Sequence, residues 1–151
     1  EVVVMDDKAD PFAAADVARR AVDDPAIFAV IGHMTSGCAI EASRVYAHAP
    51  LAMITPSATA PELTLQQDRP GWSGERVVFR LPPPDTVQAE AAADYAVKRL
   101  SLRRFVLIHD GTPYGLGLAT ALREALKRKG GTALGLVALE RGGKDFGPAV
   151  K

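Results

Sequence analysis

Short apolar runs alternate with longer amphipathic stretches along the 151 residues of this chain. Runs rich in Val, Ile and Leu predict strands, because branched and apolar side chains suit a buried sheet. Such runs occur at residues 2–5, 27–31, 51–55, 77–81, 104–109 and 133–139. The first of them starts almost at the beginning of the chain, which favours a natural N-terminus further upstream.

Helices are predicted where apolar residues recur at helical spacing and a capping residue precedes them. Asp10 followed by Pro11 is typical of a helix start, and Asp85 with Gln88 has the spacing of a capping box. The predicted helices are residues 11–23, 36–48, 85–100, 113–129 and 145–150, with a short helical turn at 57–65. Residues 66–75 are predicted to be a surface loop, and the three prolines at 82–84 an extended connector.

This alternation predicts an α/β fold of the doubly wound kind, with a mainly parallel sheet and helices on both faces. Ligands of such sheets bind beyond the carboxyl ends of the strands. The segments that follow the predicted strands are residues 6–7, 32–38, 55–59 and 109–114, and we expect the functional site among them.

Composition and charge exclude a nucleic-acid partner and several kinds of segment. Lys and Arg together number 18, as do Asp and Glu, and a neutral chain lacks the basic surface that a nucleic acid requires. We interpret the basic run 127–129 as the end of a helix, where cations complement the dipole. Cys38 is the single cysteine, so neither an internal disulfide nor a cysteine metal site is expected. No signal peptide or apolar run of about 18 residues is present.

Motifs of catalysis are also missing. The sequence contains neither GxxxxGK[ST] nor GxSxG, and the third glycine of GxGxxG is replaced by Thr120. His33 and Ser36 could form part of a hydrolase triad, but no acid is placed for it. The pair Asp6-Asp7 could bind a cation as in signalling receiver domains, but the phosphoacceptor Asp is absent. We therefore expect no enzyme activity, cofactor or metal.

Two loops have the composition of an anion-binding site. Segments 32–37 and 55–63 each run from a strand through small hydroxylic residues into a predicted helix. Backbone N–H groups and hydroxyls at a helix N-terminus bind carboxylates. Either loop alone has a purely structural alternative, since Ser36 can cap a helix and Thr59 with Glu62 has capping-box spacing. Two such loops on adjacent strand ends, together with Tyr114, favour ligand binding.

The motifs along the chain resemble those of the leucine/isoleucine/valine-binding proteins, which belong to the type I periplasmic binding-protein superfamily. The resemblance covers nearly the whole chain and is most specific in Ala58-Thr59-x-Pro61-Glu62-Leu63 and in Asp110 with Tyr114-Gly115. The further segments that carry it are Asp6-Asp7 with Asp10-Pro11, residues 30–33, residues 53–57, Phe79-Arg80, Asp85 with Gln88, Ile108-His109 and residues 143–146.

The resemblance implies two doubly wound, parallel-sheet lobes joined by a hinge, both incomplete in this chain. Residues 1–81 would belong to the first lobe and residues 82–151 to the second, with the hinge near residues 80–85. Some family members pair a cysteine near the first Asp-rich loop with one in the Ser36 loop. Ala9 stands at the first position, so Cys38 is expected to be unpaired.

The resemblance also implies a function and a site. The protein would be the extracytoplasmic solute-binding component of an ABC importer, partnered by the permease of the inner membrane, with a branched-chain or related amino acid bound between its lobes. Ser36 and Thr59 would bind the carboxylate of the ligand. The Ala58 carbonyl and the Thr59 hydroxyl would meet its ammonium, Ser57 would lie in the same loop, and Tyr114 would close over the ligand.

A second hypothesis is the ligand-sensing domain of a regulator or receptor that shares this fold and binds a small amide or aromatic acid. A secretory signal peptide in the natural protein would favour the importer. A fused regulatory or catalytic module would favour the sensor.

Overall fold

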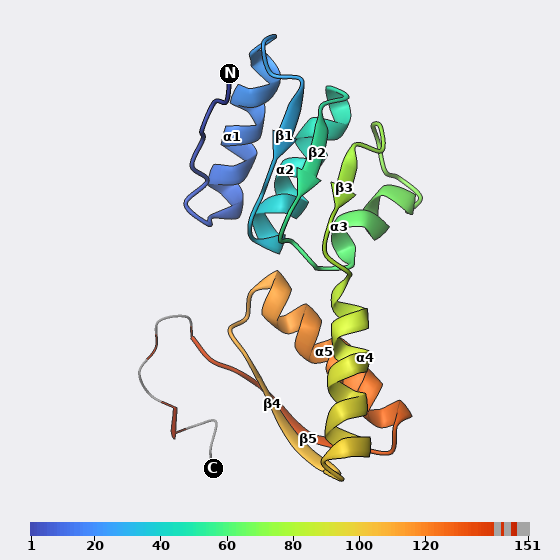
Figure 1. Ribbon diagram of the computed structural model, residues 1–151. Coiled ribbons are helices and arrows are strands. Elements are labelled where there is room, and N and C mark those ends of the chain that lie inside the picture. Colours follow the sequence, from blue (N-terminus) through green and yellow to red (C-terminus); the bar gives the residue numbers. More distant parts are fainter. Residues whose placement is uncertain (141–142, 144–145, 148–151) are drawn as a thin grey trace. The chain divides into compact units, whose positions relative to one another are not determined.

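The computed structural model describes residues 1–140, 143 and 146–147. The chain forms two compact units, Glu1–Pro83 and Pro84–Lys151, which are visible in Figure 1. Each unit combines helices with parallel strands, as the alternating pattern predicts. No helix in the described part of the chain is both long and apolar enough to cross a membrane.

The first unit contains a parallel three-stranded sheet. Its strands are β1 (Ala29–Ile31), β2 (Ala52–Thr55) and β3 (Val78–Arg80), in the order β1-β2-β3. All three lie within predicted strands. Their parallel direction brings the carboxyl ends of the strands to one edge of the sheet, which is where the two hydroxyl-bearing loops begin.

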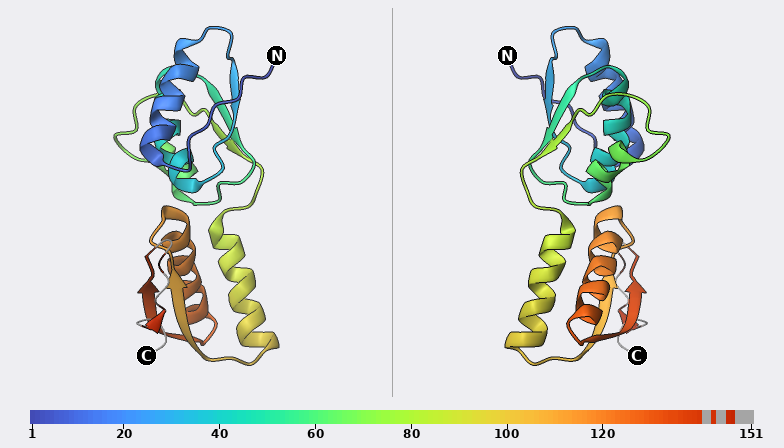
Figure 2. Two further views of the ribbon diagram at one scale, coloured as in Figure 1. Left: turned by 90° about the vertical axis from the view of Figure 1, so that its left-hand side faces the viewer. Right: turned by 90° about the vertical axis from the view of Figure 1, so that its right-hand side faces the viewer.

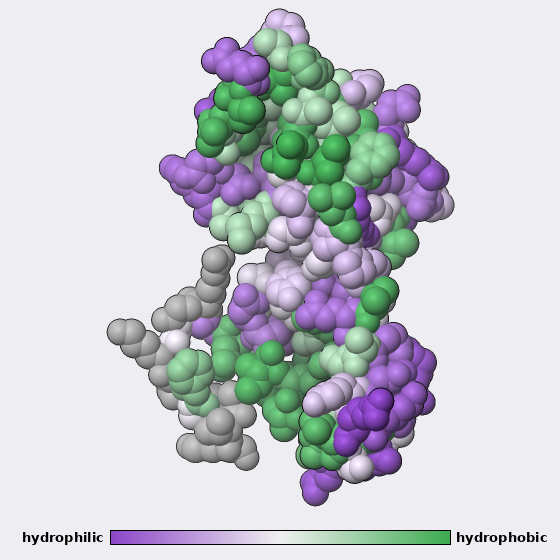
Figure 3. Space-filling model, viewed as in Figure 1, coloured by the Kyte–Doolittle hydropathy of each residue, from purple (hydrophilic) through white to green (hydrophobic). Residues whose placement is uncertain are grey.

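The two faces of this sheet differ in burial. Successive side chains of a strand point to opposite faces, and the strand register aligns them into two cross-strand rows. The covered row consists of Val30, Met53 and Val78. The uncovered row consists of Ile31, Ile54 and Phe79, which are 83%, 38% and 57% exposed. Apolar side chains gather over these strands in the space-filling view (Figure 3).

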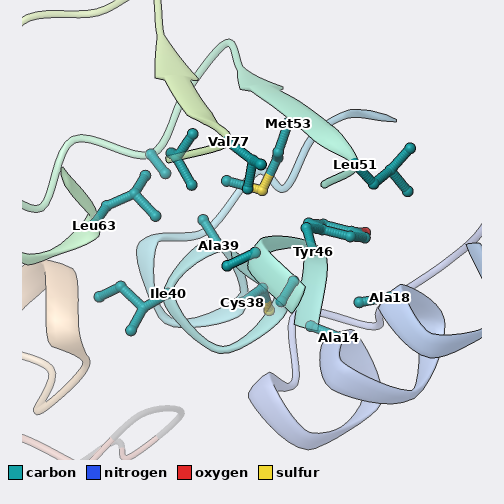
Figure 4. Close-up of a cluster of buried hydrophobic side chains, with 14 of the residues drawn as sticks. Ala14, Ala18, Cys38, Ala39, Ile40, Tyr46, Leu51, Met53, Leu63 and Val77 are labelled. Carbon is teal, nitrogen blue, oxygen red and sulfur yellow. The ribbon is translucent and has the colours of Figure 1, made fainter. Parts of the chain in front are cut away.

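Helices α1 (Pro11–Asp23) and α2 (Ser36–His48) form a layer on the covered face (Figure 2). Small residues of α1 let the two helices approach closely: Ala14, Ala18 and Ala21 are all buried in the core of this unit. Figure 4 shows α1, α2 and the strands contributing side chains to this core around Met53. The Asp10 side chain accepts a hydrogen bond from the Ala13 N–H at 2.8 Å, which confirms it as the predicted N-cap.

The segment after β2 is less helical than predicted. Helix α3 contains only Glu62–Leu65 and continues into a 3-10 turn, η1 (Gln66–Asp68), where a loop was expected. The predicted capping box of Thr59 and Glu62 is wrong, because the N-cap is Pro61 and no side chain caps the helix. Thr59 is therefore not needed to start α3.

The strand predicted at residues 2–5 is absent from the structure. Val2, Val3 and Val4 are 87%, 56% and 90% exposed. An extended segment becomes a strand only when a neighbour accepts its backbone hydrogen bonds, and no strand of the described residues pairs with this one. The sequence pattern identifies residues 2–5 as an extended apolar segment, but it cannot show whether a neighbouring strand pairs with this segment.

The second unit pairs two parallel strands and packs α5 against them. Its elements are α4 (Asp85–Asp94) continuing into a π-helical turn η2 (Tyr95–Arg99), β4 (Arg104–His109), α5 (Pro113–Arg128) and β5 (Thr132–Ala138). The core of the unit contains Ala89, Ala93, Val97, Leu107, Ala125 and Leu126. These bounds agree with the predicted elements to within a few residues.

The start of α4 differs from the prediction. Pro84 is the N-cap and no side chain caps the helix, so the capping box of Asp85 with Gln88 is wrong. Asp85 is instead the first helical residue, fully buried, and its carboxylate oxygens have no hydrogen-bond partner among the described residues. The helix predicted at residues 145–150 lies largely outside the described residues.

Candidate functional site

The first of the two hydroxyl-bearing loops connects β1 to α2. Thr35, not Ser36, is the N-cap of α2, and its hydroxyl accepts a hydrogen bond from the Cys38 N–H at 3.3 Å. Ser36 is the first helical residue and is 3% exposed. Its hydroxyl accepts a hydrogen bond from the Ala60 N–H at 3.2 Å. The alternative that Ser36 merely caps the helix is therefore wrong.

The second loop connects β2 to α3 and contains Ser57, Ala58 and Thr59. Ala58 is buried, Thr59 is half-buried and Ser57 is exposed. The Arg80 guanidinium donates hydrogen bonds to the carbonyl oxygens of Thr59 at 3.1 Å and Ala60 at 3.0 Å. These bonds from β3 hold the backbone of the second loop in place.

The two loops lie side by side in the first unit. The Ser36–Ala60 hydrogen bond joins them directly, and Thr55 at the end of β2 bonds to the backbone of both. The structure thus brings together Ser36, Ala58 and Thr59 at the carboxyl edge of the sheet, with Ser57 on the exposed side of the same loop. This is the edge at which parallel α/β sheets bind ligands.

A buried polar chain supports the first loop from behind. His33 is 6% exposed. Its Nδ1 lies 2.7 Å from Asp7 Oδ2 and its Nε2 lies 3.0 Å from the Tyr46 hydroxyl. Both ring nitrogens are therefore bonded, which leaves His33 unable to act as a base toward Ser36. The hydrolase triad considered for His33 and Ser36 is not assembled.

The environment shifts the pKa of two groups in this polar chain, Asp7 and Tyr46. Burial raises the pKa of the Asp7 carboxyl, but hydrogen bonds from His33 and from the Ala9 N–H outweigh it, so that the pKa lies below its ordinary value. Burial, with a smaller contribution from the charge of Asp7, raises the pKa of Tyr46 to about 12. The phenol therefore keeps its proton at neutral pH and can donate it to His33.

The Ser36 hydroxyl can donate a hydrogen bond in addition to the one that it accepts. It accepts one from the Ala60 N–H, and no acceptor for its own proton is found among the described residues, so that proton is available for a further hydrogen bond. The backbone N–H groups of the first turn of α2 lie beside it and add the positive end of the helix dipole. The Thr59 hydroxyl makes no hydrogen bond within the described residues. Together these groups can bind a carboxylate without a cationic side chain.

Tyr114 belongs to the second unit. It lies in the first turn of α5, after the N-cap Thr112, and is 41% exposed. The structure describes this residue within its own unit, and its contribution to the site of the first unit stays a prediction.

Two further features do not form a second site. Among the described residues, no group of three or more His, Cys, Asp or Glu side chains is arranged to hold a metal ion. A hollow of about 340 Å³ near the C-terminal end of α2 is lined by residues that include Arg44, Arg69 and Trp72. Its arginines are already paired with Glu41 and Glu62, so it offers no unpaired cation.

Sequence reasoning missed the supporting role of three residues. From the sequence, His33 is considered only for a hydrolase triad, and neither Thr55 nor Arg80 is named as a site residue. The only local signal was their place directly after or at the end of predicted strands. The bonds from His33 to Asp7, from Thr55 to His33 and from Arg80 to Ala60 span 26, 22 and 20 residues along the chain. No local pattern reveals such pairs.

Comparison with known proteins identifies the relatives of this chain. A family profile with the description "Periplasmic binding protein" matches residues 1–151. The Leu/Ile/Val/Thr-binding protein of Salmonella typhimurium is 38% identical over 148 residues, which are 98% of this chain and 38% of that protein. The chain thus spans less than half the length of the curated relatives it matches.

Solved structures agree with this result. A leucine binding protein from Thermotoga maritima has a TM-score of 0.86 at 27% identity, covering 98% of this chain and 40% of its own. The branched-chain amino acid transporter substrate binding protein from Streptococcus pneumoniae, in complex with isoleucine, has a TM-score of 0.82 at 30% identity, with coverages of 99% and 40%. The expected type I fold, present in part, is confirmed.

Proposed function

Because the chain belongs to the periplasmic binding protein family, we propose that it is part of the solute-binding component of an ABC importer. The ligand is a branched-chain or related amino acid, bound in the cleft between two lobes. The natural protein works outside the cytoplasm and delivers its ligand to a permease of the inner membrane. Its relatives are binding proteins, and we propose no catalytic step.

The observation that carries this proposal is the state of the Ser36 hydroxyl. It accepts a hydrogen bond from the Ala60 N–H, and no acceptor for its proton is found among the described residues. A hydrogen bond to a charged carboxylate is about twice as strong as one between neutral groups. The Thr59 hydroxyl on the neighbouring loop makes no hydrogen bond within the described part of the chain and supplies the second contact. The Ala58 carbonyl can accept a hydrogen bond from the ammonium.

Related proteins support the ligand class. One relative is a Leu/Ile/Val/Thr-binding protein, and one structural neighbour was solved with isoleucine. We propose that the roles of Ser36, Ser57, Ala58 and Thr59 in this chain follow the same ligand chemistry. Tyr114 completes the site from the second lobe and covers the ligand after closure.

A thermal-shift screen of the natural full-length protein tests the ligand class. A ligand that binds only the folded state raises the melting temperature. We expect shifts with leucine, isoleucine or valine. Shifts only with acids that lack an ammonium would retain the carboxylate contact and exclude an amino acid. No shift with any amino acid or small acid would contradict the importer assignment and favour the sensor hypothesis.

Replacing Thr59 by valine tests the site itself. This change removes the hydroxyl and keeps the branched shape, so we expect leucine to bind at least about tenfold more weakly in isothermal titration calorimetry. Thr132→Val is the matched control, because Thr132 is an exposed threonine in β5 of the other unit. Equal affinity of the Thr59 variant and the control would remove Thr59 from the site.

A further inference from the structure

Thr55, the last residue of β2, has a hydroxyl whose bonding capacity is fully used. The side chain is completely buried. Its Oγ1 donates to the His33 carbonyl at 2.9 Å and accepts from the Ala58 N–H at 2.9 Å and the Ser57 N–H at 3.3 Å. A hydroxyl has one proton and two lone pairs, so all three are engaged.

We propose that Thr55 is a positioning residue that fixes the first ligand-binding loop against the second. His33 lies in the loop that leads to Ser36, and Ala58 lies in the loop that presents Thr59. Thr55 therefore bonds to both loops through a single oxygen atom. The inference rests on the proposed function, because it assigns Thr55 a role in the geometry of that same site.

The link matters because few other bonds cross between the loops. The Gly32 N–H donates to the Ile54 carbonyl at 3.0 Å at the start of the first loop. Beyond that point the Ala60–Ser36 bond at 3.2 Å is the cross-link among the described residues that sets the orientation of the Ser36 hydroxyl. If the loops separate, the Ala60 N–H no longer reaches Ser36, and the serine proton is no longer directed to the ligand.

Two substitutions separate the hydroxyl from the shape of the side chain. Thr55→Val keeps the branched side chain and deletes all three hydrogen bonds, leaving the His33 carbonyl and the buried Ala58 N–H without their partner. Thr55→Ser keeps the hydroxyl and deletes only a methyl group. If the hydrogen bonds matter, the valine variant should lose affinity for the ligand and the serine variant should retain it.

The test compares three forms of the natural full-length protein: the wild type, the Thr55→Val variant and the Thr55→Ser variant. L-leucine is the probe. Titration calorimetry should show binding weakened about tenfold in the valine variant and about threefold or less in the serine variant. Hydrogen exchange of the Ala60 amide is the second measurement, and it needs no ligand. Among the described residues Thr55 makes no hydrogen bond to Ala60, so faster exchange at Ala60 in the valine variant alone would report that the loops have separated.

A double-mutant cycle with Ser36→Ala adds a readout that a merely structural role would not change. If Thr55 acts by positioning Ser36, its effect on leucine affinity must shrink when Ser36 is already an alanine.

The proposal is overturned if the Thr55→Val variant binds leucine as tightly as the wild type does. It is also overturned if the Thr55→Ser variant loses as much affinity for leucine as the Thr55→Val variant does. It is also overturned if Ala60 stays protected in the valine variant or if exchange rises equally throughout the first unit. A wild type that binds no leucine would contradict the proposed function instead, and the Ala60 exchange would still decide whether Thr55 holds the loops together.

Discussion

Replacing Tyr46 by phenylalanine removes one oxygen atom and leaves the ring in the core. The ring is completely buried and lies near His33, with a distance of 6.0 Å between ring centroids. The deleted hydroxyl is the partner of His33 Nε2 at 3.0 Å. Because His33 is only 6% exposed, water cannot readily replace that partner, and a buried polar atom is left unpaired.

The expected loss of stability follows from that geometry. A buried polar group deprived of its partner costs about 1–3 kcal/mol. With a denaturant slope of about 2 kcal/mol/M in urea, a loss of about 2 kcal/mol lowers the unfolding midpoint by about 1 M. Urea unfolding of the natural protein, followed by circular dichroism, measures this midpoint. The slope itself should not change, because the variant exposes the same surface on unfolding.

Tyr95→Phe is the matched control. Tyr95 is 60% exposed in the second unit, and the same chemical change there should alter stability by less than about 0.5 kcal/mol. If Tyr46→Phe unfolds at the same urea concentration as the control, the hydrogen bond from Tyr46 to His33 contributes nothing. The account of a polar chain that supports the first loop would then be refuted.

Three further predictions concern the same unit. Cys38 is fully buried and burial raises the pKa of its thiol, so we expect iodoacetamide to add mass only after unfolding, and rapid labelling of the native protein would contradict this. Asp10→Ala deletes an N-cap and should cost about 1 kcal/mol in urea unfolding, whereas the exposed Asp23→Ala, at the opposite end of α1, should not destabilise. The pKa of Asp7 lies below 3.8 when folded, so its ionised form stabilises the protein above that pH and this stabilisation disappears as the pH falls further. The free energy of unfolding should therefore fall less steeply with decreasing pH in Asp7→Asn than in the wild type. If it falls equally in both proteins, Asp7 does not contribute to the acid sensitivity of stability.

Local chemistry allowed much of the fold to be predicted. The adjacent residues Asp10 and Pro11 are enough to predict the start of α1. The branched residues of β2 are enough to predict a strand, without information from any other part of the chain. The strand predicted at residues 2–5 failed because pairing is not a local property. The hydrogen bonds from Arg80 to the backbone before α3 are not local either, because Arg80 lies 21 and 20 residues from Thr59 and Ala60 along the chain.

The candidate site could be located but not assembled from the sequence. The sequence suggests Ser36 as a cap of α2, and only the hydrogen bond that Thr35 accepts from the Cys38 N–H shows that Thr35 is the N-cap. The polar chain of Asp7, His33 and Tyr46 joins residues 26 and 13 positions apart. Such pairings arise from tertiary packing, and a single sequence carries no periodic signal for them.

The uncovered row of Ile31, Ile54 and Phe79 sets a practical condition for laboratory work on this chain. Contiguous apolar patches of this kind cause association when water is their only neighbour. A preparation that leaves the face open should therefore fluoresce with hydrophobic dyes, adhere to chromatography resins and precipitate as its concentration rises. Mild detergent or a polar substitution at Phe79, which projects away from the buried core, offers a direct way to keep such a preparation in solution.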